Sequence, residues 1–167
     1  GNTYALLERT DESVAAFLRC VEVNQQIGDD SMLYIALGNL SFIYYLIQDY
    51  SGSRDYLQQT LKLGRKIGVQ DLLHREIEVV LLDVLEGAGI NDVKDTLVTL
   101  TANAIKVNDP LALINSIETG VILFTQEARY DIVPLLIGAY RNSPMYDSDD
   151  AMGHFQVNAA LEVLKQH

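Results

Sequence analysis

A pattern that recurs about every forty residues constrains this chain more than any other feature of its sequence. An apolar residue, then Gly or Asn, then polar residues stand at 27–30 ("IGDD"), 67–70 ("IGVQ") and 107–110 ("VNDP"). A period of this length is typical of repeat proteins, in which each repeat is one supersecondary unit and the stacking of neighbours buries a continuous core. The sequence therefore predicts a stack of similar units.

Within each period, apolar residues are spaced as they are on one face of a helix. A first set follows the spacing i, i+3, i+4, i+7, which is the stripe of an amphipathic helix. Its members are Leu37, Leu40, Ser41 and Tyr44, then Ile77, Val80, Leu81 and Val84, then Ile117, Gly120, Val121 and Phe124, and last Val157, Ala160, Leu161 and Leu164. A second set is Thr10, Ser13, Phe17, Cys20 and Val21, then Tyr50, Ser53, Leu57, Thr60 and Leu61, then Ile90, Val93, Leu97, Leu100 and Thr101, and last Tyr130, Val133, Ile137, Tyr140 and Arg141. Each period thus predicts a pair of helices, and the fold class is all-α.

The residues between helices are suited to end one helix and start the next. Gly28, Gly68 and Asn108 stand where a second helix ends, and they adopt the left-handed conformation of a helix C-cap most readily. Pro110 is placed at the first turn of a helix, where proline is tolerated. Side chains that can cap the following helix are Asp30 or Ser31, Asp71, Asp109, and Asp149 or Asp150. The recurring polar clusters are therefore interpreted as boundaries between repeats.

Charge and hydropathy exclude two classes of partner. The net charge of −11 would repel a phosphate backbone, so the sequence argues against direct binding of nucleic acid. No apolar run is long enough to span a bilayer, so no membrane partner is expected. The basic residues Lys62, Arg65 and Lys66 share one helical face, which we interpret as a solvated surface.

The single cysteine and the start of the chain bear on its location. Cys20 cannot form an internal disulfide, which fits a reducing compartment, so we expect a cytoplasmic protein. Because Cys20 matches the helix position of Thr60, it is expected to be a small buried residue. The opening "GNTYALLE" has no features of a secretory signal, and we expect it to lie in the interior of a longer protein.

No group of residues indicates catalysis or metal binding. The histidines His74, His154 and His167 do not pair with another histidine or with cysteine at the spacing of a zinc site. There is no glycine-rich phosphate loop and no nucleophile beside a base. We therefore expect no metal, no cofactor and no enzymatic activity.

The segment "ALGNLSFIYYLIQDYSGSRDYLQQTLKLGRKIG", residues 36–68, resembles the tetratricopeptide repeat in its longer form of about forty residues. The resemblance extends over nearly the whole chain and implies a right-handed superhelix of antiparallel helix pairs in a single domain, 1–167. The implied repeats are about 1–29, 30–69, 70–109 and 110–149, with a capping helix at 150–166. Departures from the family pattern are bulky residues at crossing positions, among them Val93 and Tyr140, and Pro144, which predicts that the last second helix ends near Arg141.

The resemblance also implies a concave surface lined mainly by the first helix of each pair. Carried over from the family, its lining would be Ile35, Gly38, Phe42, Tyr45 and Leu46, then Arg75, Glu78, Leu82, Leu85 and Glu86, and then Asn115, Glu118, Ile122, Thr125 and Gln126. This face changes along its length from aromatic to acidic and polar. A clamp for a partner's terminal carboxylate, as in some members, is not expected beside three glutamates. For Phe42, Tyr45 and Leu46, burial under neighbouring helices is the competing interpretation, and for the glutamates it is simple solvation.

These features predict a non-catalytic module that binds a peptide or helix of a partner protein, as an adaptor or scaffold. The partner would offer apolar anchors to Phe42 and Tyr45 and basic or amide groups to Glu78, Glu86 and Glu118. The alternative is a regulatory domain of a larger bacterial signalling or transcription-regulatory protein, in which a bound peptide or small molecule changes the curvature of the superhelix. Self-association through exposed ends of the superhelix is a further expectation.

Overall fold

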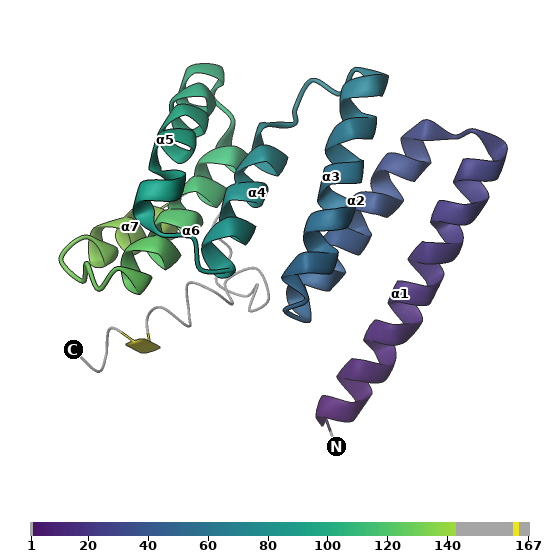
Figure 1. Cartoon of the computed structure of the whole chain (residues 1–167), viewed down its shortest axis with the longest axis horizontal. Coiled ribbons are helices and arrows are strands. Elements are labelled where there is room, and N and C mark those ends of the chain that lie inside the picture. Colours follow the sequence, from purple (N-terminus) through teal and green to yellow (C-terminus); the bar gives the residue numbers. More distant parts are fainter. Residues whose placement is uncertain (1, 143–161, 164–167) are drawn as a thin grey trace. The chain divides into compact units, whose positions relative to one another are not determined.

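The computed structural model describes residues 2–142 and 162–163, and in that part of the chain every regular element is a helix (Figure 1). The helices are α1 (Asn2–Ile27), α2 (Asp30–Leu46), α3 (Tyr50–Ile67), α4 (Leu73–Leu85), α5 (Ile90–Val107), α6 (Pro110–Gln126) and α7 (Val133–Arg141). The all-α prediction is therefore confirmed. The predicted capping helix 150–166 falls almost wholly outside the described residues.

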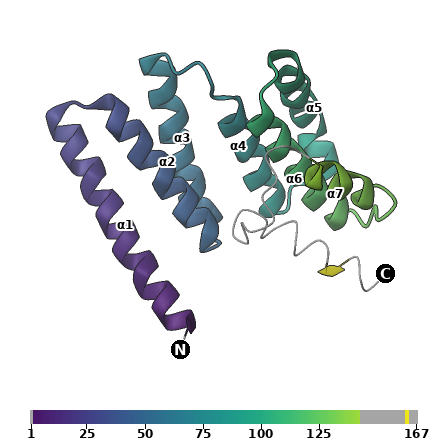
Figure 2. The ribbon, with the colours of Figure 1, turned by 180° about the vertical axis from the view of Figure 1, so that it is seen from behind.

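The chain forms two compact units, Gly1–Leu72 and Leu73–His167, and the boundary lies close to the predicted start of a repeat at residue 70. In the first unit, α2 packs against both α1 and α3. In the second unit, α4 packs against α5 and α6, α6 also packs against α5, and α7 packs against α6. Figure 2 shows the helices of each unit from behind. The assignment of one repeat domain to 1–167 stays a prediction.

The first-helix stripes form the core of both units, as predicted. Leu40 on α2, Ile77 and Val84 on α4, and Val121 on α6 have no exposed surface, and the other described members are buried or half-buried. The fourth set, which begins at Val157, lies outside the described residues. Burial of such side chains contributes roughly 1.5–3 kcal/mol each, so these stripes contribute substantially to the stability of each helix pair.

Small residues let α2 and α3 approach closely. The Ser41 hydroxyl donates a hydrogen bond to the backbone carbonyl of Ser53 at 3.0 Å, so both buried serines lie at the crossing. The rings of Tyr44 and Tyr56 stack beside it with centroids 5.3 Å apart. Burial raises the pKa of the Tyr56 phenol, and the neighbouring Tyr44 adds to the effect. The polar members of the two stripes therefore fit the interior because each finds a partner.

The C-caps and the N-cap of α6 match the prediction, and the N-cap of α2 does not. Gly28, Gly68 and Asn108 all have positive φ, at 73°, 76° and 55°. Asp109 caps α6 by accepting a hydrogen bond from Ala112 N–H, with Pro110 in the first turn, as predicted. At α2, however, the capping side chain comes from neither Asp30 nor Ser31. The residue before them caps the helix.

The true cap of α2 is Asp29, which accepts a hydrogen bond from Met32 N–H at 3.0 Å. Asp30 instead forms an ion pair with Lys66, at 2.7 Å, which links the start of α2 to the end of α3. The prediction failed because either of two consecutive aspartates suits the position by type. The turn at Gly28 determines where α2 begins, and it places Asp29 at the N-cap.

Cys20 is exposed, so the prediction that it is a small buried residue was wrong. Phe17 and Val21 of α1 are half-buried, and α1 packs against α2, whereas Cys20 lies on a neighbouring face of the same helix. Its counterpart Thr60 on α3 has no exposed surface. Equivalent positions of two repeats can thus differ in burial, because Phe17 and Val21 on α1 are only half-buried whereas their counterparts Leu57 and Leu61 on α3 are buried.

The last second helix is short, as Pro144 predicted. Helix α7 spans Val133–Arg141, nine residues, whereas α3 and α5 each span eighteen. Its core residues Val133, Ile137 and Tyr140 are buried and pack with Val121 of α6. The prediction that this helix ends near Arg141 is therefore confirmed.

Replacement of Gly68 by alanine is expected to lower the free energy of unfolding by about 1 kcal/mol, since the left-handed conformation places a Cβ too close to the following carbonyl. No atom lies within 4 Å of a Cβ added at Gly68, so the cost is conformational and not steric crowding by neighbours. Urea denaturation followed by circular dichroism measures the change.

The matched control is Gly138→Ala in the interior of α7, where an added Cβ also meets open space. Because this glycine is helical, the substitution is expected to raise stability by about 0.5–1 kcal/mol. Changes of the same sign at the two positions would contradict the capping role of Gly68.

Candidate functional site

The first unit presents an apolar stripe on α2 that its own packing does not bury. Ile35 and Phe42, two turns apart, are 50% and 48% exposed. The opposite side of the same helix carries the buried residues Leu37, Leu40 and Ser41. An α2 with apolar residues on both sides differs from an ordinary surface helix, which has a polar outer face. We call Ile35, Phe42, Tyr45 and Leu46 the α2 face.

Aromatic rings extend the α2 face toward the start of α3. The rings of Phe42 and Tyr45 are stacked with centroids 6.4 Å apart and planes 22° apart. Tyr45 in turn lies 6.4 Å from the ring of Tyr50. Tyr45 and Leu46 are half-buried. Such a row of rings offers a preformed surface for apolar side chains and, at the ring faces, for cations.

Tyr50 is a member of this aromatic row that the sequence did not assign to the site. Its position in the second-helix set predicted a core residue, and in the structure it is half-buried. The ring reaches Tyr45 because the tight turn at residues 47–49 reverses the chain, so that the end of α2 and the start of α3 lie together. The sequence feature that could have predicted this contact is the presence of Tyr45 and Tyr50 on either side of a short turn.

In the second unit, the predicted site residues of α4 and α6 lie on two helices that pack against each other. Arg75 and Glu78 form an ion pair at 2.9 Å, and their side chains are 23% and 26% exposed. Asn115 and Glu118 on α6 are half-buried, while Glu86 and Gln126 are exposed. We call these six residues the α4–α6 face. The Arg75 charge is thus balanced within α4, and the face keeps an acidic excess.

Two apolar members of the predicted lining are buried. Leu82 is 2% exposed and Ile122 is 6% exposed, so each offers little surface to a ligand in this conformation. Gln126 donates a side-chain hydrogen bond to the backbone carbonyl of Val84 at 3.1 Å, which joins α6 to α4. Of the remaining predicted positions, Gly38 is buried, and Leu85 and Thr125 are half-buried.

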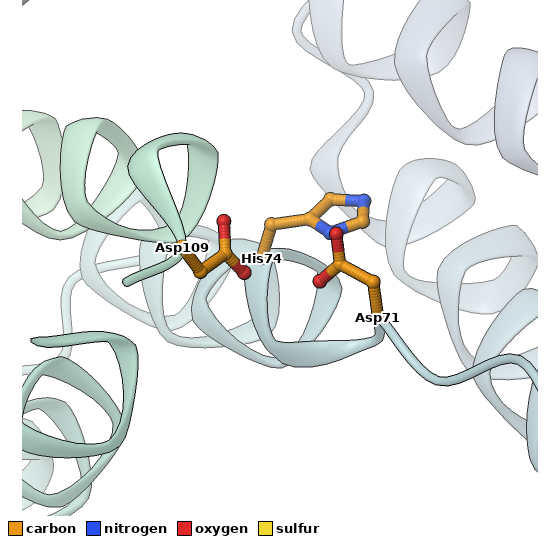
Figure 3. Close-up of side chains that lie close together, drawn as sticks. All are labelled: Asp71, His74 and Asp109. Carbon is orange, nitrogen blue, oxygen red and sulfur yellow. The ribbon is translucent and has the colours of Figure 1, made fainter. Parts of the chain in front are cut away.

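Figure 3 draws the side chains of Asp71, His74 and Asp109. Within the second unit, a ring nitrogen of His74 and a carboxylate oxygen of Asp109 lie within 4.8 Å of each other. The Asp109 carboxylate also accepts the capping hydrogen bond of α6 at 2.9 Å. Asp71 belongs to the first unit, which leaves two ligands in the second, fewer than a protein zinc site uses. We therefore assign no metal site to this pair.

Two further observations concern the chain as a whole. Among the described residues, no helix combines the length and the apolar character needed to cross a membrane. Comparisons with protein-family models, with curated proteins and with solved structures each found no match.

Replacement of Phe42 by alanine is expected to lower the free energy of unfolding by less than about 1 kcal/mol, because about half of this side chain is already in water. Leu57→Ala in α3, where the side chain is 1% exposed, is expected to cost about 2–5 kcal/mol. Denaturant titration of both variants measures the difference. Equal losses would show that Phe42 is a core residue and not part of a free surface.

Proposed function

We propose that this chain is a non-catalytic protein–protein interaction module of the tetratricopeptide-repeat kind, in which helix pairs stack as a right-handed superhelix. Support comes from the period of about forty residues and from the burial of the first-helix stripes of α2, α4 and α6. The glycine and asparagine C-caps at the end of α1, α3 and α5 add to it. A cytoplasmic location is part of the proposal. It is supported by the presence of a single cysteine, which cannot form a disulfide within the chain.

The observation that carries the proposed function is the α2 face. Phe42 is exposed to solvent and stacks on Tyr45, on a helix whose other side is buried. Contact between such an apolar surface and water is unfavourable, and a partner that covers the surface removes this cost. Aromatic residues are also enriched in the central parts of protein interfaces. An apolar side chain of a bound peptide or helix is therefore the ligand group that fits this surface.

The α4–α6 face supports the second part of the partner's chemistry. Three negative charges come from Glu78, Glu86 and Glu118. Arg75 forms an ion pair with Glu78. Acidic groups select for basic or amide-bearing segments, mostly through the rate of association and through rejection of acidic competitors. We propose an adaptor or scaffold role for a partner that combines apolar anchors with lysine, arginine or amide groups.

The proposal predicts that a random peptide library displayed on messenger RNA yields binders with one or more large apolar residues. In the variant F42A/Y45A, binding of a selected peptide is expected to weaken at least about tenfold, since removal of anchors at an interface centre typically costs more than 1 kcal/mol. Fluorescence anisotropy of the labelled peptide measures the affinity.

The matched control is Val23→Ala on α1, which removes a side chain of similar exposure, 45%, outside the α2 face. It is expected to leave the affinity unchanged. Selection of no peptide, or equal loss in both variants, would contradict the proposal. If instead a small molecule from a metabolite set raises the melting temperature and no peptide binds, the chain acts as a ligand-sensing regulatory domain.

A further inference from the structure

Helix α5 carries an exposed apolar stripe that its packing in the second unit leaves uncovered. Val98 and Ile105 are 67% and 65% exposed, and Ala102 between them is exposed as well. The three follow the spacing i, i+4, i+7, so they lie along one side of the helix. Buried residues of the same helix, Val93 and Ala104, lie on its other side. We call Val98, Ala102 and Ile105 the α5 stripe.

The equivalent side of α3, one period earlier, is polar. Gln58, Lys62 and Arg65 occupy the positions that correspond to the three members of the α5 stripe, and all are exposed. A polar residue is the ordinary choice at a solvated helix position. The corresponding positions of the two helices are thus equally open to solvent, but those of α3 are polar and those of α5 are apolar, as at a surface that contacts another molecule.

Charges at the two ends of the α5 stripe are arranged for self-recognition. Asp95 and Lys106 are exposed and eleven residues apart, which is about three helical turns, so they lie on the same edge of α5. If two α5 helices pack antiparallel, Asp95 of each faces Lys106 of the other. One two-fold contact then contains two opposite-charge pairs, as self-complementary interfaces require.

The charge balance of α5 favours a second copy over a charged partner of another kind. The helix contains Asp92, Asp95, Lys94 and Lys106, so its net charge is zero although the chain carries −11. Asp92 is engaged at the helix start, where its carboxylate accepts a hydrogen bond from Gly89 N–H. A neutral helix gives no preference to an acidic or a basic partner, and it spares two copies the repulsion that most of this acidic surface would impose.

We propose that the chain self-associates through α5, with two copies related by a two-fold axis and their α5 stripes packed antiparallel. The axis passes at about the level of residues 100–102, where the small side chain of Ala102 lets the two helices approach closely. Val98 and Ile105 of each copy pack against those of the other on either side of the axis. This surface is separate from the α2 face and does not depend on the proposed function.

A contact of one helix pair is small, so the dimer is weak. Stable specific interfaces bury at least about 1,200 Å², and a single pair of short helices buries less. We expect a dissociation constant between about 1 µM and 1 mM. Sedimentation equilibrium over that range of protein concentration is expected to show a reversible monomer–dimer equilibrium, and a wholly monomeric chain at the highest concentration would overturn the proposal.

The triple variant V98Q/A102K/I105R gives α5 the side chains that α3 carries at the same positions. Because these residues are exposed in both helices, the fold is expected to persist, which circular dichroism checks. Dimerisation is expected to be lost over the whole concentration range. The control Leu135→Gln changes a side chain of α7 that is 73% exposed and is expected to leave the equilibrium unchanged. An unaffected dimer in the triple variant would overturn the proposal.

Charge reversal tests the two-fold arrangement itself. Asp95→Lys alone and Lys106→Asp alone each place like charges opposite each other twice, and each is expected to weaken the dimer about tenfold or more. The double variant D95K/K106D restores both pairs and is expected to dimerise as the native chain does. An equimolar mixture of the two single variants is expected to form heterodimers. If the double variant stays as weak as the single ones, the antiparallel arrangement is wrong.

Discussion

Burial of one apolar stripe on each first helix is the interaction on which the rest of this structure depends. Leu40, Ile77 and Val121 have no exposed surface, and each belongs to the first-helix stripe of its own period. A helix with such a stripe cannot bury it alone, so it requires a second helix beside it. The pairing of helices, the turns between them and the surfaces that remain for binding all follow from this requirement.

The close crossing of the two helices in a pair then decides which residues are left outside. Ser41 and Ser53 meet at the crossing of α2 and α3. The buried side chains of α2, such as Leu37 and Leu40, lie on the same side of the helix as Ser41, and other large side chains of α2 lie on the side away from the core. Phe42 and Ile35 are on that opposite side, and the turn after α2 brings Tyr50 toward Tyr45. The α2 face is thus a consequence of how the pair is packed.

Periodicity in the sequence was enough to predict the helices, the first-helix core and the C-caps, because these depend on residue type and local spacing. It did not predict the exposure of Cys20, since that depends on how much of α1 its neighbours cover. Nor did it predict the burial of Leu82 and Ile122. The phase of a helix tells which residues share a face, but not how much of that face its neighbours cover.

We propose that the chain is a stack of units of about forty residues, each of which supports its neighbours. Deletion of the whole predicted repeat 70–109 tests it most directly, in comparison with deletion of 90–109, which removes α5 and leaves α4 without the second helix of its predicted repeat. Circular dichroism and thermal unfolding of both shortened chains are the measurements. The account predicts that the longer deletion keeps helical content per residue and a cooperative transition, and that the shorter one loses both. A folded chain after the shorter deletion, or an unfolded one after the longer, would contradict it.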